Sequence, residues 1–189
     1  MKYIAVYCGA STGDKPEFVK AAYDLGKHIA QQGYTLIYGG GAIGIMGAVH
    51  DGVLDHGGHV IGIMPRFLHE REIASDRIDE LIIVETMHER KQKIADMADA
   101  FVLAPGGGGS LDEFFEIYCW AQIGLHQKPI AIYNVDHFYT PLKQLLDHMI
   151  QHQFIGKNYE ALAPLYDNAE ALIEHLQQAK AVEVRTYDK

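Results

Sequence analysis

The sequence predicts an α/β fold, with residues 1–189 forming a single domain around a parallel, doubly wound β-sheet. Short apolar runs alternate with helix-like segments along most of the chain, and glycine-rich loops follow several of these runs. The length of 189 residues is typical of one domain. Such alternation produces right-handed β-α-β units. Ligands of these sheets bind beyond the carboxyl ends of the strands, so we expect the functional site in the loops that follow strands.

Six apolar runs have the short, continuous pattern of strands that are covered on both faces. They span residues 3–8, 35–38, 59–64, 81–85, 100–104 and 129–134. After Pro16, apolar residues recur three or four positions apart and stop at Gly33, which predicts an amphipathic helix. Residues 138–179 have a helical pattern that is interrupted at Gly156 and Pro164. Residues 182–189 are a possible short closing strand.

Composition excludes several classes of function. The net charge is -9, and no basic run is long enough to follow a nucleic-acid backbone. We find no 18-residue apolar span and no signal peptide, so we expect a cytoplasmic protein with no membrane partner. Cys8 and Cys119 are too few for a disulfide framework or a zinc ribbon, and we expect both to be reduced. His148 and His152 lack the glutamate of a zinc motif, so we predict no metal site.

Two of the loops carry glycines in patterns that packing or turn chemistry also explains. The first, "CGASTGDKP", combines Gly9 and Ser11 ahead of a helix. The second, "YGGGAIGIMG", contains the G-x-G-x-x-G of dinucleotide-binding proteins. An acidic residue should follow at the end of the next strand, but Arg66 lies there, which favours a phosphate-bearing mononucleotide over NAD. Alternatively, Gly44 and Gly47 only permit close packing of a helix on a strand.

The third loop, "LAPGGGGSLDEFFE", permits two interpretations. Four glycines before a helix expose amide groups that suit a phosphate. Ser110 and Glu113 also have the spacing of a capping box, in which both side chains bond the first turn of the helix. The capping box does not require four glycines, and a second glycine-rich loop in the same sheet favours the phosphate interpretation.

Three side chains of the following helix lie on an unexpected face. Leu111, Phe114, Phe115 and Tyr118 define the predicted buried stripe. Glu113 and Glu116 then fall on the opposite face together with Trp120. A solvated acidic face does not explain the tryptophan, whereas a cleft or a subunit interface explains all three residues.

Arg90 falls on the apolar stripe of the preceding helix, three positions after Met87 and four before Ile94. Arginine is rarely buried without a partner. It is either a snorkelling or ion-paired structural residue, or a guanidinium that binds an anion or positions a carboxylate.

Residues 87–91, "MHERK", and 105–113, "PGGGGSLDE", resemble the paired signature M-H-E-R-K and P-G-G-x-G-T-x-x-E of the lonely-guy family. The resemblance extends over nearly the whole chain, because "CGAS", "YGGGAIGIMG" and "IGIMP" occur in the matching order. It implies a Rossmann-like homodimer that hydrolyses the N-glycosidic bond of adenine-type nucleoside 5′-monophosphates, such as AMP and cytokinin riboside 5′-monophosphates. Family members were earlier often labelled lysine decarboxylases.

The resemblance implies that Arg90 and Glu113 are the catalytic pair and that the partner is a small nucleotide substrate. It implies no metal or redox cofactor. The implied substrate-binding residues are Ser11, Gly40, Gly41, Gly44, Gly47, Met87, Gly106, Gly107, Gly109, Ser110 and Glu116. This chain departs from the family pattern at three positions: Ser110 replaces a threonine, Gly108 an aromatic residue and Ile94 a methionine. We expect these departures to affect which base the protein prefers more than which reaction it catalyses.

Glycosidic cleavage at C1′ develops oxocarbenium character, which Glu113 would stabilise while it activates water. Arg90 would orient Glu113 and lower its pKa. The alternative is a non-catalytic nucleotide carrier, since molybdenum-cofactor carrier proteins have a similar architecture. A decarboxylase is disfavoured because no loop offers a convincing Schiff-base lysine.

Overall fold

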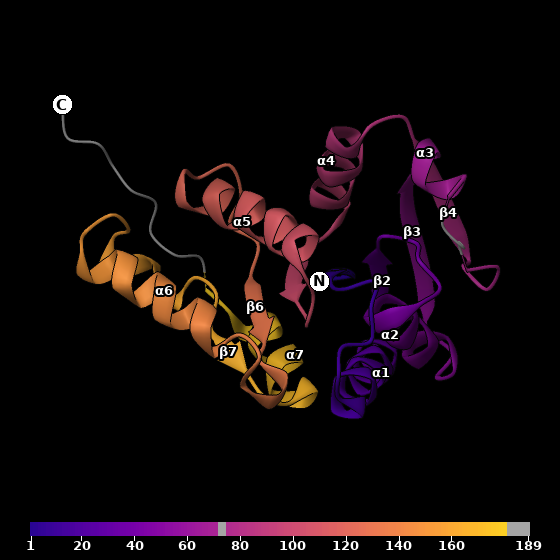
Figure 1. Ribbon diagram of the computed structural model, residues 1–189, viewed down its shortest axis with the longest axis horizontal. Helices are drawn as coiled ribbons and strands as arrows, with labels where there is room; N and C mark the ends of the chain where they lie inside the picture. Colours follow the sequence, from indigo (N-terminus) through magenta and orange to yellow (C-terminus); the bar gives the residue numbers. More distant parts are fainter. Residues whose placement is uncertain (72–74, 181–189) are drawn as a thin grey trace.

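A seven-stranded parallel sheet forms the centre of the protein in the computed structural model, which describes residues 1–71 and 75–180 (Figure 1). Its strands are β1 (Tyr3–Tyr7), β2 (Thr35–Tyr38), β3 (His59–Pro65), β4 (Glu80–Val84), β5 (Ala100–Leu103), β6 (Ile130–Tyr133) and β7 (Leu165–Tyr166). Their order across the sheet is β4-β3-β2-β1-β5-β6-β7. The chain therefore starts at the centre, builds one half of the sheet outward, and returns to build the other half from β5.

β1 and β5 are parallel neighbours in the sheet, but the connections that follow them lead to opposite halves of the sheet. Their register pairs Ile4 with Ala100 and Tyr7 with Leu103. The loop after β1 leads to α1 and β2 on one side, whereas the loop after β5 leads to α5 and β6 on the other. The loops diverge at this point, which is where open α/β sheets form their ligand crevice.

Helices cover both faces of the sheet (Figure 1). The longer ones are α1 (Pro16–Gln31), α2 (Gly44–Leu54), α4 (Met87–Met97), α5 (Gly108–Gln122), α6 (Thr140–Gln151) and α7 (Ala169–Gln178). The short ones are α3 (Arg66–His69) and the 3-10 segments η1 (Val135–His137) and η2 (Lys157–Ala161). Among residues 1–71 and 75–180, no helix has the length and apolar character needed to cross a membrane.

Alternating side chains of the strands belong to two separate hydrophobic clusters, as expected for a sheet buried on both faces. In β1, Ile4 and Val6 pack with α1, α2 and α7, whereas Ala5 and Tyr7 pack with α4, α5 and α6. The first cluster holds α1 and α2 in place behind the loop after β1. The second fixes α4 beside α5, which decides the geometry of the site.

The six predicted strands are all present, with ends that differ from the prediction by at most one residue. The first helix also matches, and Gly33 after its end has a φ of 72°. β7 was not predicted: it lies in the region expected to be helical, directly after the interruption at Pro164. Two residues that pair only with β6 are too short to produce a sequence pattern. The strand predicted at residues 182–189 lies outside the described residues.

Candidate functional site

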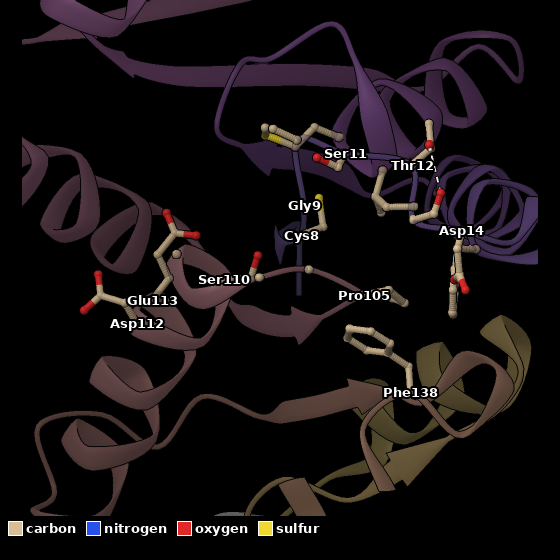
Figure 2. Close-up of a pocket in the computed structure, with 18 of the residues that line it drawn as sticks. Cys8, Gly9, Ser11, Thr12, Asp14, Pro105, Ser110, Asp112, Glu113 and Phe138 are labelled. Carbon is tan, nitrogen blue, oxygen red and sulfur yellow. Dashed lines mark hydrogen bonds between the residues drawn. The ribbon is translucent and has the colours of Figure 1, made fainter. Parts of the chain in front are cut away.

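A cavity of about 510 Å³ lies where the loops after β1 and β5 meet (Figure 2). Its volume is within the usual range for small-molecule sites. The loop after β1 contributes residues 8–14, and the loop after β5 contributes Pro105, Gly106 and Gly107. The starts of α2, α4 and α5 complete the wall together with Phe18 and Phe138. The cavity thus lies in loops that follow strands, where the strand pattern predicted the functional site, and the fold shows that these loops are at the switch point of the sheet.

Backbone hydrogen bonds join the loops that surround the cavity. The Gly9 amide donates to the Pro105 carbonyl (3.0 Å), and the Gly9 carbonyl accepts from the Met46 amide (3.1 Å). A Cβ atom on Gly106 would lie 2.8 Å from the Gly9 nitrogen and 2.2 Å from Ser110 Oγ. Only glycine allows this approach of two backbones. The "CGAS" loop, weak evidence by itself, therefore shapes the same cavity as the glycine run.

α5 begins at Gly108, with Gly107 as its N-cap. The first amides of a helix have no partner within it, and the helix dipole adds partial positive charge there. Gly107, Gly109 and Ser110 line the cavity at this end, which therefore suits an anion such as a phosphate. Because the helix starts two residues before Ser110, this serine lies within the first turn and is buried. The predicted capping box at Ser110 and Glu113 is therefore wrong.

A capping arrangement of this kind is found instead at the start of α4. Thr86 Oγ1 accepts from the Glu89 amide (3.1 Å), and the Glu89 carboxylate accepts from the Glu85 amide (2.8 Å). This same T-x-x-E spacing was not recognised in the sequence. It fixes the first turn of α4, from which Arg90 extends toward α5.

Arg90 and Glu113 form an ion pair between α4 and α5. Arg90 Nη2 donates to Glu113 Oε1 at 3.1 Å. The two side chains are only 12% and 9% exposed, so water screens the pair little. Arg90 Nε is buried and has no hydrogen-bond partner among the described residues. Arg90 lines the cavity, but this nitrogen itself is not exposed to it.

The pKa of Glu113 is raised, because burial of the carboxylate outweighs the opposing effect of Arg90. Lys91 also lowers this pKa, whereas Asp112 and Glu116 raise it. The expectation that the nearby cation produces a net lowering is therefore wrong. Sequence reasoning identified the partner of Glu113 but not the depth at which the pair lies.

The wall of the cavity around Phe138 is aromatic and was not predicted. Phe138 contacts Phe18 edge to face, with ring centroids 5.5 Å apart. The preceding residues Asp136 and His137 have φ values of 48° and 62°, a backbone conformation that residues other than glycine rarely adopt. An ion pair between Asp136 and Lys15 joins this turn to α1. Asp136 is a turn-forming residue type, but it was not recognised as a turn signal in the sequence.

Many of the predicted site residues meet at the cavity. Its wall includes Ser11, Met87, Arg90, Gly106, Gly107, Gly109, Ser110 and Glu113. Glu113 is buried between the helices, not placed on the face opposite the apolar stripe, whereas Leu111 and Phe115 of that stripe are only partly buried. Trp120 is partly buried against the cluster on the α4 and α5 face.

The remaining predicted residues do not line the cavity. Gly40 packs against Met64, Gly41 against Met46, and a Cβ on Gly47 would lie 2.4 Å from the Ala42 carbonyl oxygen. Gly44 has a φ of 66°, and its Cβ would overlap the Ala10 backbone at 2.3 Å. Glu116 instead accepts a hydrogen bond from Lys91. These glycines allow close packing around the loop, which was the alternative interpretation of the motif.

Arg66, the cation expected near the phosphate, is exposed and pairs with Glu85 at 2.9 Å, away from the cavity wall. Gly39 was not selected from the sequence, yet a Cβ on it would lie 2.5 Å from Arg90 Nη2. Gly39 is thus the glycine of the second loop that leaves room for the Arg90 guanidinium. Only the fold reveals this contact, since β2 and α4 are far apart in the sequence.

No group of three side chains able to hold a metal ion occurs in the described parts of the chain. His148 and His152 are exposed neighbours on α6, with ring centroids 4.4 Å apart. Cys8 and Cys119 are both free. Cys8 lines the cavity, and burial raises the pKa of its thiol, so the group stays neutral.

Comparison with known proteins identifies the family of this chain. Residues 46–176 match the profile of the family described as "Possible lysine decarboxylase". The rice protein "Cytokinin riboside 5′-monophosphate phosphoribohydrolase LOG" is 41% identical over 93% of this chain and 72% of its own. The Arabidopsis thaliana phosphoribohydrolase LOG7 is 40% identical over 94% of this chain and 82% of its own.

Solved structures show the same fold at lower identity. The molybdenum cofactor carrier protein of Chlamydomonas reinhardtii has a TM-score of 0.72 and 19% identity, over 94% of this chain and 96% of its own. The molybdenum cofactor binding protein of Rippkaea orientalis has a TM-score of 0.70 and 24% identity over the same shares. At this identity the likeness establishes the α/β architecture alone.

Proposed function

Because the chain belongs to the lonely-guy family, we propose that it hydrolyses the N-glycosidic bond of adenine-type nucleoside 5′-monophosphates. AMP and cytokinin riboside 5′-monophosphates are the proposed substrates, and the free base and ribose 5-phosphate are the products. The observation that carries the proposal is the buried Arg90–Glu113 pair in a cavity that also contains the N-terminus of α5. The cavity therefore brings together a carboxylate, a guanidinium and a helix N-terminus that suits an anion.

The phosphate is proposed to bind at Gly106, Gly107, Gly109 and Ser110. These residues bring backbone amides and one hydroxyl to the cavity, and glycine leaves room for the phosphate oxygens. Glu113 follows Ser110 by three residues, about 4.5 Å along the helix axis. A 5′-phosphate at the first turn thus places the ribose beside the next turn, where Glu113 lies.

Glu113 is proposed to act as a carboxylate on the far side of C1′ from the base. It accepts a proton from water while the water oxygen bonds to C1′ and the C1′–N bond breaks, with the bonding electrons leaving on the base. The departing base is neutralised by a proton from solvent, and Glu113 releases the proton that it took from water to solvent. Arg90 holds the carboxylate through Nη2.

The deciding experiment is chromatographic detection of free base and ribose 5-phosphate from a panel of nucleoside monophosphates, including AMP and N6-substituted AMP. Equimolar appearance of both products supports the proposal, and the panel ranks the bases. Retention of a nucleotide with no product would contradict it and favour a carrier of the same fold.

The raised pKa of Glu113 predicts the pH dependence of the reaction. The carboxylate form increases as pH rises through this pKa, so kcat/KM should rise along a limb centred above the ordinary glutamate value of 4.5. A pH series of initial rates at low substrate concentration measures this limb. A limb centred below 4.5 would contradict the assignment of Glu113 as the ionised group.

We also propose that the protein is a homodimer that forms through the C-terminal part of α5. Trp120 is only partly buried there, and Ile123 and Leu125, which follow it, are 59% and 67% exposed. Exposed apolar side chains gathered at one place are typical of an interface. Light scattering should give twice the monomer mass of 21.1 kDa, and Leu125→Asp should shift the mass toward the monomer. A monomeric wild-type protein would contradict this proposal.

A further inference from the structure

Lys91, the residue after Arg90, joins α4 to two carboxylates of α5. Its Nζ lies 3.2 Å from Asp112 Oδ2 and 3.3 Å from Glu116 Oε1. The Lys91 side chain is only 12% exposed, whereas that of Asp112 is 62% exposed. Burial lowers the pKa of Lys91, but the combined effect of its two carboxylate partners in raising this pKa is larger. The net shift is therefore upward, and the ammonium stays charged.

Arg90 and Lys91 of α4 therefore form ion pairs with three carboxylates of α5. Arg90 pairs with Glu113, while Lys91 pairs with Asp112 and Glu116, the acidic residues on either side of Glu113. Without Lys91, Asp112 and Glu116 would both act on a buried carboxylate whose pKa burial has already raised. Lys91 itself does not line the cavity.

We propose that Lys91 is a positioning residue, which holds the acidic turn of α5 against α4 and keeps Glu113 ionised at the pH of the reaction without touching the substrate. This inference rests on the proposed function, in which Glu113 acts as a carboxylate. It assigns to the last residue of "MHERK" a task that neither the sequence motif nor the cavity wall indicates.

The charged and titratable groups around Glu113 come from three elements. Arg90 and Lys91 approach from α4, Asp112 and Glu116 from α5, and Tyr7 and Cys8 from the end of β1 and the first residue after it. Burial raises the pKa of both Tyr7 and Cys8, which stay neutral across the range in which Glu113 titrates. The charges that shift the pKa of Glu113 are therefore those of Arg90 and Lys91 on α4 and of Asp112 and Glu116 on α5.

The test uses substitutions that move the acidic limb of kcat/KM in opposite directions. Lys91→Met removes a cation and should shift the limb to higher pH, with a larger loss of kcat/KM at acidic than at alkaline pH. Asp112→Asn removes a carboxylate and should shift the limb to lower pH. Lys91→Arg should restore the wild-type limb. Lys93→Met removes an equal charge from the exposed face of α4 and should leave the limb unchanged.

A second measurement is independent of activity. The carbon-13 signal of the Glu113 carboxyl, assigned by its absence in Glu113→Gln, reports the titration of Glu113 directly. Failure of the proposed function would show as no base release, while the opposite shifts of this signal in the Lys91 and Asp112 variants would still support the electrostatic role. If Lys91→Met does not fold, Glu116→Gln replaces it and should shift the signal as Asp112→Asn does. Equal titrations in Lys91→Met and Lys93→Met, or shifts of one sign in the Lys91 and Asp112 variants, would overturn the inference.

Discussion

Glu113→Gln is expected to lower kcat for base release by about 10²- to 10⁴-fold, the usual contribution of a positioned acid or base. Glutamine has nearly the same shape, and its carbonyl oxygen can still accept from Arg90 Nη2, which now donates at 3.1 Å. It cannot accept a proton from water or balance positive charge at C1′. Because substrate contacts at the start of α5 remain, KM should change much less than kcat.

The control for this substitution is Glu174→Gln on the exposed face of α7, which makes the same chemical change far from the cavity. It should have wild-type kinetics. Glu113→Gln keeps one hydrogen bond but leaves the buried Arg90 without its counter-charge, so its unfolding temperature should fall below that of the wild type, and its kinetics are measured where the protein is folded. Full activity in a folded Glu113→Gln protein would rule out Glu113 as the reacting carboxylate.

Gly39→Ala is expected to reduce kcat/KM by about 100-fold, the scale of loss that a misplacement near 1 Å produces. The new Cβ would lie 2.5 Å from Arg90 Nη2 and 3.2 Å from Arg90 Cζ. The guanidinium is already bonded to Glu113 in a buried place, so it cannot move away without lengthening that bond. The loss should therefore resemble that of an Arg90 variant, although Gly39 provides no functional group.

Gly108→Ala is the matched control, since it is also a glycine-to-alanine change and its Cβ meets nothing within 4 Å. Gly108 begins α5 but does not line the cavity. It should retain wild-type rates and a similar unfolding temperature. If Gly39→Ala has wild-type rates as well, the close approach of β2 to Arg90 does not position the guanidinium.

Local patterns were sufficient for the strands and for the first helix. A strand buried on both faces appears as a short apolar run, and each of the six runs became a strand. The motif pair also located the cavity correctly, because loops after parallel strands share one edge of the sheet. Prediction was weaker wherever a residue's neighbours come from elsewhere in the chain. Gly41 and Gly44 match the dinucleotide motif as well as Gly39 does, but of these three only Gly39 lies beneath Arg90.

The sequence by itself determined the order of strands and helices, the glycine loops at their ends and the presence of Arg90 and Glu113, since spacing along the chain encodes these features. Only the tertiary structure decided that α5 starts at Gly108, that Phe138 closes the aromatic part of the cavity wall and that Lys91 joins two carboxylates. It also reversed the expected direction of the Glu113 pKa. The physical reason is that desolvation and close contact depend on every element packed around a group, whereas a motif records only the residues of one segment.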